Sequence, residues 1–600
     1  MAFPPLSRPS PDTVQATLKN VRPYTVGELP VIASFCRKIG IPDIIDRLCP
    51  SQASVASGTV VTAMVLDILS GRSPLYRVED FWRQQDTELV LGEEIDASAL
   101  NDDALGRTLD RIHEAGTMKI FTEISLAACR RFGVSLRDGS FDTTSVNVWG
   151  DYATSTPGGD APHICHGYSK DRRPDLKQFT MSLLCVEGNI PIIGKVEDGN
   201  RPDCKANNEE LQNLAAYLRG AGIARRDFLY IADCKLVDEK NLALLGSNPF
   251  ITRLPASYGA NREATLAAIG ADDWTAIGKL NQTPDSTNRP AASYSYSEQE
   301  VTLYGGVYRA VVVRSSNLDK RKEKGLQRRI EKAEKTVKRR LKEIRRETYQ
   351  CEGDATRALQ KLREESASGY WKIDGEILER KTYARGRVAE GKERRVTART
   401  WSIDPRHQEN HDLIAGERQL AGHFILLTNV PAGGKGAPTG EEILRRYKAQ
   451  HGIEQNFSFL KEPWIANDTF LKSPRRIESL GMLLLLSLLV WSLMQRALRR
   501  SLEEDTEGDL VLTNLDRRPT DRPTSFILVH KFKKVSILRH GALRVLAPSL
   551  NRDQHNYLRA LDLGGRGDLH RPATAADWMR VVRESIKWRP ILSNGAECVL

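Results

Sequence analysis

The chain has 600 residues, which is too long for a single hydrophobic core, so we expect several domains. With 40% hydrophobic and 28% charged residues, the composition is that of a globular protein and excludes a fibrous or low-complexity chain. The 88 Lys and Arg residues outnumber the 77 Asp and Glu residues, and the formal charge of +11 suits a polyanionic partner.

The cysteines and the apolar segments indicate in which cellular compartment the protein is expected. None of the nine cysteines forms a Cys-x-x-Cys pair, so we expect neither a disulfide framework nor a structural zinc site, and a reducing cytoplasm fits. Residues 1–20 have no apolar core and are predicted to be a disordered lead-in rather than a signal peptide. The run Met482–Leu493 is shorter than the roughly twenty residues of a membrane span, so we expect a buried helix and no membrane.

Residues 21–135 are predicted to form an all-helical N-terminal domain. Apolar residues recur at helical spacing from Leu29, the turn Gly40-Ile41-Pro42 separates two short helices, and Asn101 caps a helix that runs to His113. Two roles stay open for this domain: DNA binding through a helix-turn-helix, or packing and dimerisation.

Residues 136–255 change in character, because alternating Thr, Val and Ile segments indicate strands. Three strands that follow one another directly, and then helices alternating with strands, predict an α/β sheet with helices on its faces. The expected strands are 140–148, 179–186, 190–196, 228–232 and 250–254, and the expected helices are 207–219 and 238–245.

Residues 256–415 interrupt that pattern with three short strand-like segments and a basic helix at about 318–348. The apolar residues of this helix fall in one narrow stripe, and its other faces are Lys, Arg and Glu, which is typical of a solvated helix or of one that tracks DNA. Residues 416–505 return to strand and helix, with a strand at 422–429, a helix from Thr439 to about Lys461 and an apolar helix at 475–500. Residues 506–600 form a C-terminal region, with short strands expected at 525–529 and 535–538.

Three acidic residues lie on separate elements of the interrupted sheet. Asp142 is inside the first strand, Asp233 ends the strand 228–232, and Glu454 is on the helix after the interruption. Carboxylates that converge repel one another unless cations neutralise them, and Mg²⁺ prefers oxygen ligands. The pattern therefore predicts a magnesium site.

The helix with Glu454 adds a second signal. Tyr447, Gln450, Glu454 and Lys461 fall within an arc of about 60° on a continuous helix, so one face presents a phenol, an amide, a carboxylate and an ammonium group. A carboxylate flanked by hydrogen-bond donors and a cation suits a metal-bound phosphodiester.

These residues resemble a known family. The spacing of Tyr447, Glu454 and Lys461 is similar to the Tyr-x2-Arg-x3-Glu-x6-Lys signature of DDE transposases from bacterial insertion sequences. The segment 166–178, HGYSKDRRPDLKQ, is similar to the Ser-Lys-Asp-x-Arg-Pro-Asp-Leu-Lys-Gln segment of one branch, and Asn101–Asp110 also looks like that branch. The resemblance covers most of residues 20–530.

The resemblance implies an α/β RNase H-like catalytic core interrupted by an α+β insertion domain, with an all-α N-terminal domain. It implies that Asp142, Asp233 and Glu454 are catalytic and bind two Mg²⁺ or Mn²⁺ ions, which activate a water or a DNA 3′-hydroxyl and stabilise the leaving oxygen. The implied reaction is cleavage at transposon ends followed by strand transfer into target DNA. The implied partners are double-stranded DNA, as terminal inverted repeats and target, and a second copy of the chain, in a prokaryotic cytoplasm close to the nucleoid.

The resemblance also implies DNA contacts. Tyr447 and Lys461 are expected near the cleaved phosphate, while Gln450 stands where the signature has Arg and offers a neutral hydrogen bond in place of a charged, bidentate one. The basic hairpin is expected either to contact the DNA backbone or to be a solvated turn, and its candidate residues are Lys170, Arg172, Arg173 and Lys177.

Two other functions remain open. The same core in a metal nuclease cuts DNA without strand transfer. A transposase-derived protein that has lost catalysis only binds DNA, and the change at Gln450 favours this reading while the three acidic residues oppose it.

Overall fold

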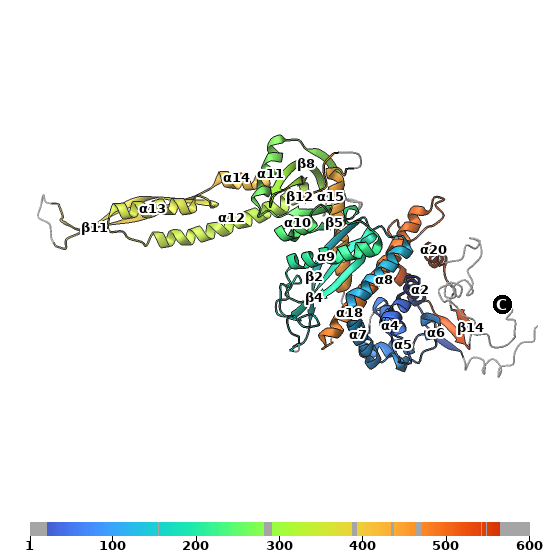
Figure 1. Cartoon of the computed structure of the whole chain (residues 1–600). Coiled ribbons are helices and arrows are strands. Elements are labelled where there is room, and N and C mark those ends of the chain that lie inside the picture. The colour runs from blue at the N-terminus through green and yellow to red at the C-terminus, as the bar shows by residue number, and fades with distance from the viewer. Residues whose placement is uncertain are drawn as a thin grey trace, which may run out of the picture. The chain divides into compact units, whose positions relative to one another are not determined.

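The computed structural model describes residues 21–71, 73–153, 155–280, 291–386, 393–433, 437–461, 471–541, 543–547 and 549–563 (Figure 1). The predicted lead-in at 1–20 and the last residues of the C-terminal region lie outside these ranges. The chain divides into two compact units, with Met1–Phe250 and Lys448–Leu600 in unit 1 and Ile251–Tyr447 in unit 2.

The N-terminal part of unit 1 is helical, as the sequence predicts, apart from the short strand β1 (Arg22–Tyr24). The turn at Gly40 has a φ of 88°, a conformation that glycine adopts without strain, and it ends one helix and begins the next. The side chain of Asn101 caps its helix by accepting a hydrogen bond from the Ala104 amide at 2.9 Å. The helices are α2 (Leu29–Ile39), α3 (Ile41–Leu48), α4 (Ser57–Ser70), α5 (Val78–Arg83), α6 (Thr87–Leu91), α7 (Asp102–Ala115) and α8 (Thr117–Phe132).

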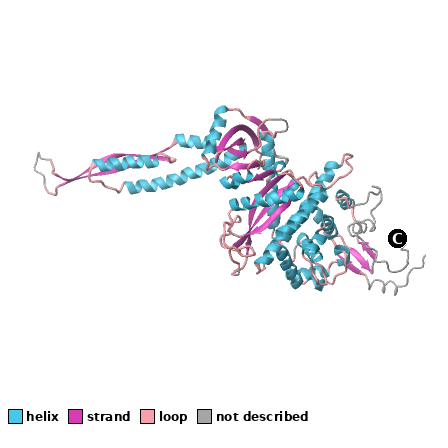
Figure 2. Ribbon diagram, viewed as in Figure 1, coloured by secondary structure: helices cyan, strands magenta, loops and turns pink. Residues whose placement is uncertain are grey.

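A mixed sheet follows these helices in unit 1, and the predicted strands and helices of this region are confirmed. The strand order is β4-β3-β2-β5, in which β2 is antiparallel to β3 and parallel to β5, and β3 is antiparallel to β4. Unit 1 is therefore mixed α/β (Figure 2). Its elements are β2 (Asp138–Val148), β3 (Lys177–Val186), β4 (Ile190–Glu197), α9 (Asp203–Ala221), β5 (Leu229–Ala232) and α10 (Glu239–Leu245).

The long helix α18 (Pro474–Glu504) packs closely on this sheet. A Cβ on Gly194 of β4 would lie 2.6 Å from Leu485, and a Cβ on Gly481 would lie 2.3 Å from Val196, so glycines allow the close approach. By length and composition α18 is long and apolar enough to cross a membrane, but 89% of its most apolar window is buried inside the protein. A core helix has the same composition.

The C-terminal region of unit 1 differs from its prediction. The run Ser525–Val529, expected to be a strand, belongs to helix α19 (Ser525–Phe532), because Thr524 caps its first turn and Ser525 donates to the Trp491 carbonyl at 2.7 Å. The second expected strand is shifted to β13 (Ile537–His540), which lies between β1 and β14 (Leu543–Leu546) in a three-stranded sheet. The helix α20 (Arg552–Ala560) follows.

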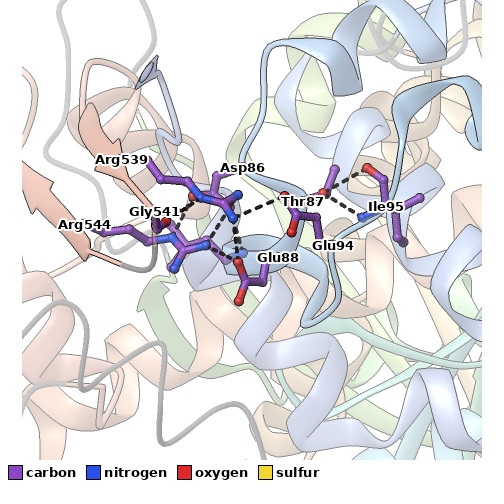
Figure 3. Close-up of polar contacts among 9 residues, drawn as sticks. Asp86, Thr87, Glu88, Glu94, Ile95, Arg539, Gly541 and Arg544 are labelled. Carbon is purple, nitrogen blue, oxygen red and sulfur yellow. Dashed lines mark hydrogen bonds and ion pairs between the residues drawn. The ribbon is translucent and has the colours of Figure 1, made fainter. Parts of the chain in front are cut away.

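An ion-pair cluster joins the C-terminal hairpin to α6 (Figure 3). The Asp86 side chain is 0% exposed and accepts from Arg544 at 2.7 Å and from Arg539 at 3.2 Å. Burial lowers the pKa of Arg544, but hydrogen bonds to Asp86 and Glu88 outweigh it and raise the pKa above its ordinary value. These contacts hold the hairpin of β13 and β14 against α6.

Unit 2 contains five strands in the order β6-β12-β9-β8-β7, and their pairings along β12, β9, β8 and β7 are antiparallel. Because β12 pairs with β6 and β9, residues up to Tyr447 group with the interruption, whereas the sequence placed the core boundaries at 255 and 415. The elements are β6 (Phe250–Leu254), α11 (Gly259–Ala271), β7 (Thr275–Lys279), β8 (Ser293–Leu303), β9 (Gly306–Ser315), β12 (His423–Thr428) and α15 (Gly440–Ala449).

Within unit 2, two helices and a long hairpin run side by side (Figure 1). The apolar stripe predicted on the basic helix is confirmed, because Leu341 and Ile344 pack with Ile373 and Ile403 of the hairpin, and Leu326 and Ile330 pack with Ile414. The elements are α12 (Ser316–Ile344), α13 (Glu352–Ser366), β10 (Trp371–Tyr383), β11 (Val396–Glu409) and α14 (His411–Leu420).

Candidate functional site

Asp142 and Asp233 are the residues directly after the last matched positions of a parallel strand pair in unit 1. In the register of β2 and β5, Phe141 lies opposite Ala232, and Asp142 and Asp233 are the next residues. Asp233 keeps an extended backbone, with φ −71° and ψ −177°, so it continues the direction of β5. Neighbouring strands are about 4.8 Å apart, and side chains alternate between faces, so the two aspartates start from adjacent points on one face.

The local structure of each aspartate is fixed by short contacts. Asp142 Oδ1 accepts from the Thr143 amide at 2.7 Å, and Asp233 Oδ1 accepts from the Lys235 amide at 2.9 Å in the turn that follows β5. Both side chains are half-buried. The pKa of the buried Tyr230 is raised well above its ordinary value, mainly by burial and then by the negative charges of Glu210 and Asp233. The charge of Asp233 therefore acts on a residue of the core.

Glu454 lies on α16 (His451–Lys461), which packs against β2. Asn456 anchors the helix by donating to Cys185 Sγ at 3.2 Å and to the Asn189 carbonyl at 2.8 Å. Cys185 is the cross-strand partner of Ser140, two residues before Asp142, so α16 is anchored on the face of the sheet from which Asp142 projects. Glu454 itself is exposed, beside the buried side chains of Ile453, Phe457 and Leu460.

The helix with Glu454 is not continuous with Tyr447, so the prediction of one helix from Thr439 to Lys461 is wrong. α15 ends at Ala449, Gln450 is in a turn, and α16 begins at His451. Just after the break, Gly452 packs closely on Asn189, because a Cβ there would lie 1.8 Å from the Asn189 side chain. The predicted arc of four side chains therefore does not exist as one helix face. Tyr447 is half-buried on α15 in unit 2.

A basic loop reaches the acidic residues in unit 1. Lys170 Nζ donates to the carbonyl of Thr143 and, at 2.9 Å, to its hydroxyl, and it lies 3.9 Å from Asp142 Oδ1. Lys461 Nζ, at the end of α16, pairs with Asp171 Oδ1 at 2.7 Å. The structure thus brings Lys170 and Lys461, two of the predicted DNA contacts, to the loop beside Asp142.

The other predicted basic contacts lie in the same loop or, for Lys177, at the start of β3. Arg173 forms a two-point ion pair with Asp175 and stacks over Trp149 at 5.3 Å from the ring centre, and Lys177 pairs with Asp151 at 3.6 Å. Arg172 is exposed, with a φ of 60°. These positions are accessible to a partner, and Arg173 and Lys177 already hold acidic neighbours.

The described side chains form no metal cluster. Across the ranges that the structure describes, no group of three or more His, Cys, Asp and Glu side chains is arranged to hold a metal ion. The parallel pair supplies two carboxylates at adjacent positions, and the third is on a helix that packs on the same strand.

The sequence did not predict two residues that hold α16 and Lys461 in place. Asn456 fixes α16 on the sheet, and Asp171 holds Lys461. The only signal for Asp171 was its place in the Ser-Lys-Asp segment, and Asn456 gave none because a polar residue between apolar helix positions is common.

Comparison with known proteins gives three findings. A family model described as a domain of unknown function, DUF4277, matches residues 21–126, which is the helical N-terminal part. No curated protein matches the chain. Among solved structures, the chain has a weak likeness to the Mos1 transposase paired-end complex with the left transposon end, with a TM-score of 0.14 and 15% identity over 34% of this chain and 67% of that one.

Proposed function

We propose that this protein is a DNA transposase of an insertion sequence, which cuts DNA at transposon ends and joins it to target DNA. The observation that supports the proposal is that Asp142 and Asp233 directly follow the last matched residues of the parallel strands β2 and β5, with the Glu454 helix packed on β2. Three antiparallel strands followed by a helix and a parallel strand are also what an RNase H-like core requires.

The donor chemistry fits two divalent cations. Carboxylate oxygens are the ligands that Mg²⁺ and Mn²⁺ prefer, and the proposed ligands are Asp142, Asp233 and Glu454. When bound, such a pair of ions activates the attacking oxygen and stabilises the leaving oxygen in an in-line displacement. Since the described side chains form no three-membered cluster, the proposal includes a change of Glu454, whose exposed side chain is able to turn toward the aspartates.

The basic residues have a second role in this proposal. Lys170 lies 3.9 Å from Asp142, and Lys461 pairs with Asp171, the next residue along the loop. A DNA phosphate that enters the site is a stronger partner for Lys461 than the exposed Asp171 carboxylate. Lys170 and Lys461 then position the phosphodiester, and Arg172, Arg173 and Lys177 contact the backbone further out.

The test uses DNA taken from both sides of the gene, which carries the inverted repeats that an insertion sequence would have. The purified chain with Mg²⁺ or Mn²⁺ is expected to nick these fragments at the repeat ends and to join pre-cut 3′-hydroxyl ends to a plasmid. Asp142→Asn, Asp233→Asn and Glu454→Gln are each expected to lower cleavage at least 100-fold, because each removes a carboxylate ligand.

A matched control is Asp138→Asn, since Asp138 is on the same strand as Asp142, four residues away. It is expected to cleave like the unaltered chain. Cleavage without joining of pre-cut ends would assign a nuclease instead. Metal-dependent cleavage that survives Asp142→Asn would refute the assignment of the site.

A further inference from the structure

The helix α12 has two faces with different functions. Its apolar side chains pack on α13, α14 and the β10–β11 hairpin, as Leu326, Ile330, Leu341 and Ile344 show. These four side chains are buried, with relative exposures of 6% or less. The packing of unit 2 therefore uses one side of the helix only, and the opposite side faces solvent.

The solvent side has a regular row of cations. Their spacing along the chain is four, four, three, four and three residues, which keeps them within an arc of about 80° at 3.6 residues per turn. Over 18 residues of helix the row is about 27 Å long. All six side chains are exposed, and we call them the α12 cation row: Lys324, Arg328, Lys332, Lys335, Arg339 and Lys342.

The cation row differs from the other basic residues of the helix in its pairing. Off the row, Arg329 pairs with Glu417 at 3.2 Å, Lys338 with Glu334 at 2.6 Å, and Arg340 with Glu343 at 3.1 Å. No member of the cation row has an ion pair to any residue in the described part of the chain. Six exposed cations in a row without ion-pair partners are placed for an external polyanion.

We propose that the α12 cation row binds the phosphate backbone of duplex DNA without reading its sequence, an inference that rests on the proposed function. Duplex DNA has one negative charge per about 1.7 Å of axis, so a straight row of about 27 Å meets phosphates along its whole length. Single strands are bound chiefly by stacking on aromatic side chains, and α12 contains none. A second copy of the row is excluded as a partner because like charges repel.

The test compares two triple variants that remove the same charge from the same helix. K335Q/R339Q/K342Q removes half of the row, and R329Q/K338Q/R340Q removes three cations that already have acidic partners. Affinity for a duplex of arbitrary sequence is measured at several salt concentrations for the full chain. The row variant is expected to lower the slope of log affinity against log salt by about 2.7, or 0.9 for each lost phosphate contact.

The control variant is expected to leave that slope within about 1 of the unaltered chain. Equal slopes for the two variants would overturn the proposal, since net charge alone would then explain binding. A row variant that loses as much affinity for single-stranded DNA as for duplex would also overturn it. Every substituted side chain of the row is exposed, so the row variant is expected to fold like the unaltered chain. An unchanged circular dichroism spectrum checks this expectation.

The same proteins separate this inference from the proposed function. If the unaltered chain cleaves transposon ends and the row variant keeps its salt slope, the proposed DNA binding by the α12 cation row is wrong and the transposase assignment stands. If no metal-dependent cleavage occurs but the slope falls as expected, the proposed DNA binding by the α12 cation row is correct and the catalytic assignment fails.

Discussion

Glu210 of α9 is a buried acid, and replacing it by Gln is expected to stabilise the protein at neutral pH. The residue is 3% exposed, and one of its carboxylate oxygens has no hydrogen-bond partner in the described part of the chain. Burial, and then the charge of Glu197, raise the pKa of Glu210 from 4.5 to about 8. At pH 7 the folded protein therefore holds Glu210 protonated, whereas the unfolded chain ionises it.

The sign of the pH dependence follows from proton binding. Between pH 4.5 and about 8 the folded state binds the Glu210 proton and the unfolded state does not, so the free energy of unfolding falls as pH rises through this window. A shift from 4.5 to about 8 corresponds to at most about 5 kcal/mol. Glu210→Gln keeps the shape of the side chain and removes this cost, so we expect a gain of about 2–4 kcal/mol at pH 8 and almost none at pH 4.5.

Hydrogen exchange of peptides from α9, corrected for the intrinsic effect of pH on exchange, measures this local stability. Glu239→Gln is the control, because Glu239 is exposed in the first turn of α10. It is expected to change the opening free energy by less than about 0.5 kcal/mol at every pH. A Glu210→Gln protein that opens more easily than the unaltered chain at pH 8 would mean that Glu210 is ionised and compensated in the fold.

Three further predictions concern unit 1. Lys170→Gln removes the ammonium group 3.9 Å from Asp142, so the Mn²⁺ concentration for half-saturation, measured by paramagnetic resonance, is expected to fall about 3- to 10-fold; an unchanged value would mean that Lys170 does not compete with the cation. Arg544→Met leaves the fully buried Asp86 with fewer partners and is expected to lower the free energy of unfolding, measured with urea, by about 2–4 kcal/mol. Glu94→Gln, on a 72% exposed side chain, is expected to lower it by less than about 0.5 kcal/mol. Equal losses for the two variants would contradict a structural role for the cluster. Asn456→Ala removes the anchor of α16 and is expected to lower the free energy of unfolding by about 1–2 kcal/mol and to lower cleavage. Ser458→Ala, on the exposed side of α16, is expected to change neither. If both variants cleave alike, Asn456 does not position Glu454.

The strands of the unit 1 sheet could be predicted because their pattern is local. Alternation in 140–148 and the apolar run 228–232 give the strands, with Asp142 inside the first and Asp233 just after the second. The local pattern misled at Ser525–Val529, where a β-rich run forms a helix because Thr524 caps it and α18 supplies a packing partner. The pairing of β1 with β13 joins segments more than 500 residues apart, and no local pattern encodes such a contact.

The candidate site shows the same limit in another form. Residue types and order made the three acids candidates, but the placement of Asp142 beside Asp233 depends on the parallel register of β2 and β5, in which Phe141 is opposite Ala232. A slip of one residue would turn one aspartate to the other face. Lys170 was expected to contact DNA, and its contact with Thr143 beside Asp142 arises from a loop path that the sequence does not specify.

The break at Gln450 changes what the difference from Arg means. On a continuous helix, Gln450 would present its amide beside Glu454, and the loss of a charged contact would weaken the site directly. In the structure Gln450 is in a turn, and His451 begins a separate helix that Asn456 fixes to the sheet. The position of Glu454 therefore depends on the contacts of α16 with the sheet. Since Asn456 makes those contacts whatever the residue at position 450, Gln in place of Arg is expected to leave α16 in the same place on the sheet.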